Sequence, residues 1–209
     1  MKPILLPLLE SAIKQSAAAV ISHQESINAI NYFPVSDKDT GSNLSMTFED
    51  LLCIDSDDCT ISSFMTKVSE VVFDNARGNS GIILSMWFTG LAQSKMSDMS
   101  LSLDALKKIL LNGSSYLFNN FTDISQGTMI TFLIDFTNSI HKISDINFIN
   151  DQLEYHLQAT KEANPTLKKN NVIDAGALGM KIFLESFFGI VFKGKVIQYR
   201  SIEGQQSTP

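Results

Sequence analysis

Cysteine is scarce in this sequence. Cys53 and Cys59 are the only two, and no histidine or further cysteine stands near them at the spacing of a zinc site. A chain of 209 residues can bury a sizeable core without covalent cross-links, so we interpret both cysteines as reduced thiols. Reduced thiols are typical of the cytoplasm, and the sequence therefore predicts a cytoplasmic protein.

Basic side chains are also too few for a nucleic-acid binder. The chain has 16 Lys and Arg against 22 Asp and Glu, which gives a net charge of −6, and the basic residues form no cluster. Binding to a phosphate backbone needs clustered Lys and Arg, so we expect no nucleic-acid partner. The three histidines, His23, His141 and His156, lie in different segments with no Ser-His-Asp or Cys-His arrangement around them. Acyl-enzyme chemistry has no support.

Long apolar runs are missing. The N-terminal apolar piece is interrupted by Pro3, Pro7 and Glu10, and no cleavage site follows, so it does not read as a signal peptide. The stretches 81–92 and 182–192 are shorter than the roughly 18 to 20 apolar residues that cross a bilayer. With 44% hydrophobic and 18% charged residues, the composition predicts one globular domain without a transmembrane segment.

Strand-like alternation is nearly absent, the exception being KVIQYR at 195–200. Apolar residues recur at helical spacing almost throughout, which predicts an all-α protein. We expect a helical domain over residues 1–194 and a polar tail or linker over 195–209. The nine predicted helices cover residues 4–22, 25–32, 43–54, 62–75, 80–93, 102–119, 128–142, 149–162 and 176–192.

Four of the connections are rich in small and polar residues: FPVSDKDTGSN, NARGNSG, TDISQGT and NVIDAGALG. Helices joined by short loops usually run antiparallel, so the third, fifth, seventh and ninth helices should all begin at one end of the bundle. Helix starts present unpaired N–H groups, and glycines there let a ligand approach the backbone. This pattern favours a site for a phosphorylated ligand, although Gly and Ser also punctuate helices without any ligand.

The first of these loops carries two carboxylates one residue apart, Asp37 and Asp39. Such a pair can hold a hard cation such as Mg²⁺ bridged to phosphates, with Asn31 as a weaker third oxygen ligand. An EF-hand does not fit, because Gly41 and Phe48 stand where that loop needs Asp or Asn and Glu. The alternative is that the aspartates cap the next helix, and spacing alone leaves both roles open.

Other polar residues of the loops can likewise have either a ligand-binding or a purely structural role. Ser42 and Asn43 open the third helix and can either bond phosphate oxygens or cap the helix. Arg77 can stabilise charge on a transferring phosphoryl group, but a lone arginine before a helix is more often a surface residue. Asp174 suits a helix cap or a polar contact to a ligand. The run around Arg77 is no P-loop, because GxxxxGK[ST] is absent.

Together the four loops resemble the motifs of a known family. FPVSDKDTGSN is similar to FPVPDGDTGTN, ARGNSGIILS to ARGNSGVILS, SQGTMIT to EGTxxT and VIDAGALG to VVDAGxxG. These motifs belong to the nucleotide-binding domain related to the L subunit of dihydroxyacetone kinases (DhaL), in the branch that includes the A subunit of bacterial fatty acid kinase. They occur here in the family's order between Asn31 and Gly179.

The resemblance implies an antiparallel eight-helix barrel that binds ATP or ADP at one rim, with two Mg²⁺ ions on the acidic loop. Asp37 and Asp39 match the metal-binding aspartates and, with Arg77, form the predicted catalytic set. Lys38, Ser36 and Ser42 depart from the family's Gly, Pro and Thr. The nucleotide-binding residues that the motifs imply are Thr40, Ser42, Asn43, Leu44, Asn79, Ser80, Gly81, Gly127, Thr128, Met129, Asp174, Ala175 and Gly176.

DAGALG is most similar to relatives in which this domain is fused to a DegV-like lipid-binding domain. The resemblance therefore implies an ATP-dependent phosphotransferase that moves the γ-phosphate to a fatty acid carboxylate held by a DegV-like partner or fused domain, giving an acyl phosphate. Two alternatives stay open: a small hydroxy compound as acceptor, and a non-catalytic ADP- or ATP-binding regulatory module. A homodimer is compatible with the sequence.

Overall fold

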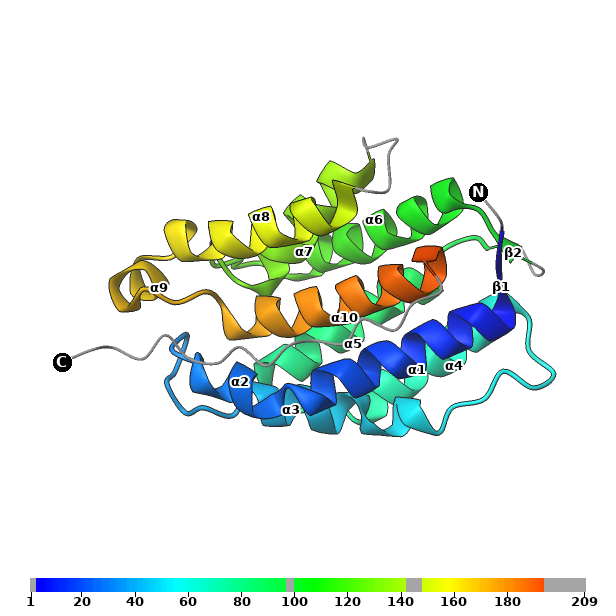
Figure 1. Cartoon of the computed structure of the whole chain (residues 1–209), viewed down its shortest axis with the longest axis horizontal. Helices are drawn as coiled ribbons and strands as arrows, with labels where there is room; N and C mark the ends of the chain where they lie inside the picture. Colours follow the sequence, from blue (N-terminus) through cyan, green and yellow to red (C-terminus); the bar gives the residue numbers. More distant parts are fainter. Residues whose placement is uncertain (1–2, 97–99, 142–147, 194–209) are drawn as a thin grey trace.

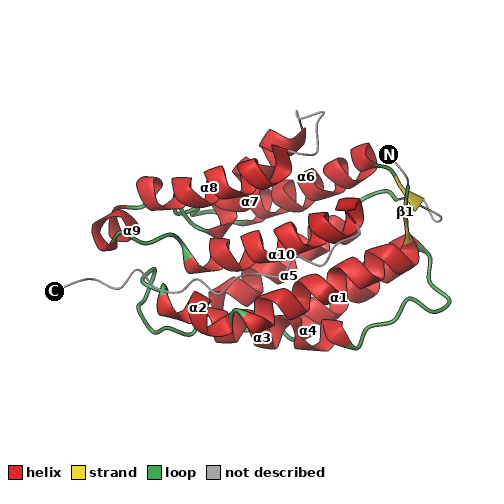
Figure 2. Cartoon of the chain, viewed as in Figure 1, coloured by secondary structure: helices red, strands yellow, loops and turns green. Residues whose placement is uncertain are grey.

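The computed structural model describes residues 3–96, 100–141 and 148–193, and helices make up most of that part (Figures 1 and 2). Apart from the six-residue helices α2 and α9, eight longer helices pack lengthwise, which confirms the predicted all-α, eight-helix antiparallel fold. The described elements are β1 (Ile4–Leu5), α1 (Leu6–Ser22), α2 (Gln24–Ala29), α3 (Thr40–Phe48), the 3₁₀ helix η1 (Glu49–Leu52), α4 (Ile61–Asp74), α5 (Gly78–Ala92), β2 (Ser100–Leu101), α6 (Leu103–Asn120), α7 (Met129–His141), α8 (Ile149–Ala163), α9 (Pro165–Asn170) and α10 (Ala175–Lys193).

Helix α10 runs through the middle of the molecule, between α1 on one side and α7 and α8 on the other (Figure 1). Residues 175–192 are long and apolar enough to cross a membrane, whereas the stretch 182–192 considered in the sequence is too short. However, 78% of these residues are buried inside the protein. Phe183 stacks on Phe48 at 5.1 Å and meets Phe88 edge-on at 5.9 Å. These contacts identify α10 as the central helix of the core.

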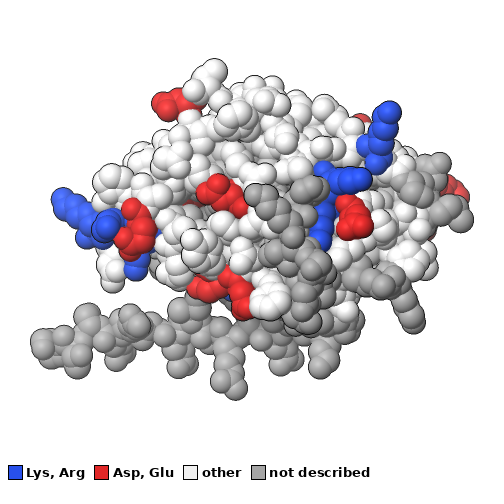
Figure 3. All heavy atoms as spheres, turned by 90° about the horizontal axis from the view of Figure 1, so that it is seen from above, with Lys and Arg blue, Asp and Glu red and all other residues white. Residues whose placement is uncertain are grey.

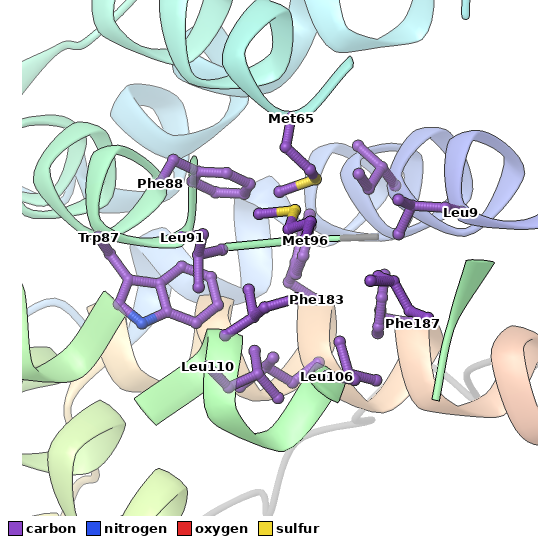
Figure 4. Close-up of a pocket in the computed structure, with 14 residues that line it drawn as sticks. Leu9, Met65, Trp87, Phe88, Leu91, Met96, Leu106, Leu110, Phe183 and Phe187 are labelled. Carbon is purple, nitrogen blue, oxygen red and sulfur yellow. The ribbon is translucent and has the colours of Figure 1, made fainter. Parts of the chain in front are cut away.

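β1 pairs antiparallel with β2 at the end of the molecule away from α9 (Figure 1). A cavity of about 30 Å³ remains between α1, α4, α5, α6 and α10 (Figure 4). Its lining is apolar throughout: Met65 and Met96 face one another across it, and Phe88 and Phe183 lie beside them (Figure 4). A volume near that of one water molecule with no polar lining is a packing defect that stays dry.

Charged side chains are spread thinly over the surface. On the face shown in Figure 3, Lys and Arg lie in small groups beside Asp and Glu. Among the ion pairs of the described residues, Lys181 lies 2.7 Å from Glu185 and 3.7 Å from Glu154. That face therefore presents no broad field of one sign.

The nine predicted helices are all present, and helix α9 is the one that the periodicity missed. Asn164 caps it, since its side-chain oxygen accepts hydrogen bonds from the N–H groups of Thr166 at 3.0 Å and Leu167 at 3.3 Å. Pro165 occupies the first helical position, as is common. The Asn-Pro pair was the available signal. The predicted strand at 195–200 and the tail 195–209 lie outside the described residues.

Candidate functional site

Four helix starts meet at one end of the barrel, as the antiparallel order predicted. They surround a pocket of about 270 Å³ that receives Thr40 from α3, the first turn of α5, the start of α7 and the start of α10. The predicted residues that line it are Thr40, Asn79, Ser80, Thr128, Met129, Asp174 and Gly176.

A second, acidic pocket adjoins the first. It has a volume of about 210 Å³, contains Asp37, Asp39 and Asn43, and shares Thr40 and Ser80 with its neighbour. Both aspartates are exposed, and the opposite wall is the first turn of α5. The two pockets form one continuous hollow with a carboxylate pair at one end.

The carboxylate pair suits a cation that completes its coordination with other oxygens. Within the described residues, no group of three or more His, Cys, Asp or Glu side chains could hold a metal ion. Asp37 and Asp39 therefore supply two carboxylates and no closed cage. Mg²⁺ is commonly bound in this way, by one or two carboxylates together with water and substrate phosphates.

Asn31 holds the acidic loop in place. This residue is 2% exposed, and its side-chain oxygen accepts hydrogen bonds from the Thr40 backbone N–H at 3.2 Å and from the Thr40 hydroxyl. Its amide nitrogen donates to the Val35 carbonyl at 2.7 Å and to Asp37 Oδ1 at 3.2 Å. With both ends engaged, Asn31 is placed as a loop clamp, and the predicted role as a metal ligand gains no support from this arrangement.

Asn28, which the sequence did not single out, caps helix α3. Its side-chain oxygen accepts hydrogen bonds from the N–H groups of Gly41 at 2.7 Å and Ser42 at 3.2 Å, and its amide nitrogen donates to the Ser42 hydroxyl. The Asn43 N–H already bonds the Asp39 carbonyl at 2.8 Å. The N–H groups of α3 that were expected to contact phosphate therefore have acceptors within the protein, and their predicted role stays a prediction.

Helix α5 is different, because its first turn is uncapped. The preceding residue, Arg77, provides no side-chain cap, and the first N–H with a partner is that of Gly81, which bonds the Arg77 carbonyl at 3.0 Å. In the part of the chain that is described, the N–H groups of Gly78, Asn79 and Ser80 have no acceptor. All three residues line the acidic pocket. An anion placed there would face free donors and the positive end of the helix.

Asp174 occupies the corner between α7, α8 and α10, and is 6% exposed. Its Oδ2 accepts a hydrogen bond from the Ala177 N–H at 2.8 Å, and its own N–H donates to the Thr160 hydroxyl at 3.1 Å. The backbone N–H groups of Met129 and Gly176 also favour the charged form of the carboxylate. Burial outweighs these bonds and raises the pKa of Asp174 to about 6.

Several predicted residues are not brought to the pockets. Leu44 is fully buried in the core, and Ala175 is 3% exposed. The Arg77 guanidinium bonds the Ala76 carbonyl at 3.0 Å and lines neither pocket, so the structure does not place it with the carboxylates. Ser42, Gly81 and Gly127 are likewise absent from both linings.

The glycines that were expected to leave room for a ligand mostly lie against other parts of the protein. A Cβ atom at Gly41 would lie 2.2 Å from the Gln24 carbonyl oxygen, and one at Gly127 would lie 2.4 Å from that of Thr160. Gly127 also has a φ of +71°, which side chains rarely adopt. Close helix packing, rather than ligand contact, explains these two positions.

The larger pocket also has walls that motif reasoning missed. Apolar side chains of Phe33, Ile82, Phe121 and Ile130 line it, and Asp123 and Ser125 stand at its α6–α7 side. These residues come from four separate segments, so no spacing within one motif predicts that they share a pocket. Apolar walls with a few polar groups suit a flat organic ring.

Comparisons with known proteins identify the fold and the family of this chain. The structure of the dihydroxyacetone kinase from C. freundii in complex with AMP-PNP and Mg²⁺ superposes on 90% of this chain and 34% of that chain, with a TM-score of 0.68 and 16% identity. The fold is thus that of the helical part of that kinase.

The DAK2 domain family model matches residues 34–189, so this chain belongs to the DAK2 domain family. Protein YloV of Bacillus subtilis is 26% identical over 202 residues, which cover 91% of this chain and 36% of YloV. Uncharacterized protein MG369 of Mycoplasma genitalium is 30% identical over 190 residues, covering 81% of this chain and 34% of MG369. The chain thus spans about a third of the length of these relatives. The predicted kinship with the dihydroxyacetone kinase domain is confirmed.

Proposed function

We propose that this chain is the ATP- and Mg²⁺-binding domain of a phosphotransferase. The observation that carries the proposal is the juxtaposition of Asp37 and Asp39 with the uncapped first turn of α5, in a pocket that opens into a larger apolar one. Phosphates would lie against the free N–H groups of Gly78, Asn79 and Ser80. The purine ring would enter the apolar pocket, which has enough volume for it.

Asp37 and Asp39 would hold the metal, with two ions as the family resemblance implies. Bound Mg²⁺ supplies neutralisation of the charge that builds up on the phosphate oxygens. The chain's own contribution is positional, because the Asn31 amide holds Oδ1 of Asp37, a residue that lines the acidic pocket. The helix α5 start would then hold the phosphates against that loop.

For the acceptor we propose a fatty acid carboxylate presented by a DegV-like partner or fused domain, with an acyl phosphate as product. An ionised carboxylate is already a nucleophile and needs no general base, so the lack of a histidine among the residues lining the pockets is no obstacle. The motif DAGALG and the relatives, about three times as long as the matched region, support an acceptor-holding module elsewhere. Such a domain acts in the cytoplasm, where ATP is supplied.

A second candidate is a regulatory module that binds ADP or ATP without turnover. Lys38 favours it, because this cation stands between the two carboxylates at an exposed position and would compete with Mg²⁺ for their charge. The two candidates share the nucleotide site and differ only in phosphoryl transfer.

Metal-dependent nucleotide binding tests what the candidates share. The double variant Asp37→Asn, Asp39→Asn should lose Mg²⁺-dependent affinity for ATP by at least about tenfold, measured by calorimetry, because two ligand charges vanish. The matched control is Asp57→Asn, Asp58→Asn, which removes the same charge from an exposed loop outside both pockets. Equal affinity in both double variants would remove the metal assignment.

Turnover separates the candidates. The domain, ATP and Mg²⁺ would be mixed with a DegV-like protein loaded with fatty acid, and ADP and acyl phosphate, trapped as its hydroxamate, would be quantified. Phosphoryl transfer to the carboxylate predicts equal amounts of both products. Tight nucleotide binding with no acyl phosphate from any loaded partner would favour the regulatory module.

A further inference from the structure

Asp174 is a buried carboxylate for which the proposed phosphoryl transfer has no use. It lines the larger pocket but lies on the opposite side from the acidic loop, at the starts of α7 and α10. No positively charged side chain lines that pocket, and Asp123 is the other acidic one. Asp174 is therefore neither an ion-pair partner nor a member of the carboxylate pair.

Asp174 lies where the starts of two helices that do not follow one another in the sequence meet. Its carboxylate accepts a hydrogen bond from the Ala177 N–H in the first turn of α10, and the Met129 N–H, the first of α7, favours its charge. The two starts touch closely, since a Cβ atom at Gly176 would lie 3.2 Å from Met129 Cβ and 3.3 Å from Asp174 Oδ2. A third helix joins through the Thr160 hydroxyl of α8.

An ionised carboxylate at this position costs stability. The helix starts and three N–H groups favour the charge, yet desolvation outweighs them, and no charged side chain contributes to the balance. A neutral cap such as Asn or Ser would satisfy a helix start without that cost. A carboxylate at this position is therefore more than the capping of a helix start requires.

We infer that Asp174 is a positioning residue whose carboxylate joins the starts of α7 and α10 and so sets the shape of the nucleotide pocket between them. This inference rests on the proposed function. Thr128, Met129 and Gly176 all line the pocket and lie on the two helix starts that the carboxylate joins. When the carboxylate is lost, α7 and α10 are free to separate by a fraction of an ångström, and a bound nucleotide loses contact with one wall.

The test compares nucleotide binding by the wild-type chain and Asp174→Asn across pH. Asparagine keeps the shape of the side chain but turns an N–H donor toward a backbone N–H. At pH 7.5 the dissociation constant for Mg·ADP should rise about tenfold, by the loss of about one charged hydrogen bond. The ratio between variant and wild type should shrink toward one at pH 5, where the wild-type carboxyl is itself protonated.

Two further measurements keep the outcome decisive. Asp104→Asn is the matched control, because Asp104 lies at the start of a helix, as Asp174 does, but is exposed and outside both pockets. Hydrogen exchange should quicken at the starts of α7 and α10 together in Asp174→Asn and in neither helix of the control. Circular dichroism confirms that both variants fold.

The outcomes separate this inference from the proposed function. If the wild-type chain binds no Mg·ADP, the proposed function fails. If it binds, and Asp174→Asn binds equally well at pH 7.5, or more weakly by a factor that stays constant from pH 5 to pH 8, the positioning role of the carboxylate is overturned.

Discussion

Lys38 adopts a backbone conformation that suits glycine. Its φ is +56°, in the left-handed region where a Cβ atom is disfavoured, and the family has Gly at this place between the two aspartates. The side chain thus adds two effects to the acidic loop, a local conformational cost and a positive charge. Two substitutions separate them.

Lys38→Ala and Lys38→Gly should both raise the affinity for Mg²⁺ at low ionic strength, by about fivefold, because each removes the competing charge. Only Lys38→Gly should raise the free energy of unfolding in urea, by up to about 1 kcal/mol, because Ala keeps a Cβ atom at positive φ. Unchanged Mg²⁺ affinity in both variants, measured in 20 to 300 mM salt, would show that Lys38 lies outside the field of the site.

Residue types alone identified the carboxylate pair but not what holds it. Asp37 and Asp39 are recognisable because hard cations require oxygen ligands at short spacing. Asn31 looked like a third ligand for the same reason, and the structure gives its oxygen to Thr40 instead. A side chain's partners depend on which atoms the fold brings within 3 Å, and short spacing in the sequence does not specify them.

At the scale of elements, helix order predicted the site correctly, whereas helix capping changed its chemistry. The starts of α3, α5, α7 and α10 do converge, because short loops force neighbouring helices to run antiparallel. Asn28 and Asn31 cap α3, and Asp174 serves α7 and α10. The first turn of α5 has no side-chain cap and lines the acidic pocket, which is why the proposed function places the phosphates there.

Asn28→Ala tests the cap on α3. It leaves the N–H groups of Gly41 and Ser42 without their acceptor, and the free energy of unfolding should fall by about 1 to 2 kcal/mol. Mg·ATP affinity should fall as well, because α3 follows directly on the acidic loop. Asn119→Ala, at an exposed position of α6, is the control and should change neither quantity. Full stability in Asn28→Ala would mean that water replaces the cap.

At the scale of the whole molecule, the buried Asp174 carboxyl makes the free energy of unfolding depend on pH. The pKa of Asp174 is about 6 in the folded state and near its ordinary value of 3.8 when unfolded, so the folded state binds more protons between these values. Its contribution to stability is therefore greatest below pH 4 and is lost as the pH rises through 6. At 1.36 kcal/mol per pH unit, this loss amounts to about 3 kcal/mol.

The unfolding free energies of wild type and Asp174→Asn should consequently diverge in a defined direction. From pH 4 to pH 7, the variant should gain about 2.4 kcal/mol relative to wild type, measured by urea unfolding at each pH. Using the difference cancels groups that act oppositely, such as Glu10, whose pKa is lowered chiefly by its hydrogen bond from Lys14. A difference that does not change with pH would show that Asp174 is not titrating in this range.

What the sequence determined by itself is the helices other than α9, their antiparallel order and the end of the barrel where the loops gather. These follow from local periodicity and short connections, which act over a few residues. Tertiary structure alone decided that Arg77 turns away, that α3 is capped by α2, and that apolar walls from Phe33, Ile82 and Phe121 complete the pocket. Each of these depends on contacts between segments that are distant in the chain, and such contacts are fixed only when the helices pack.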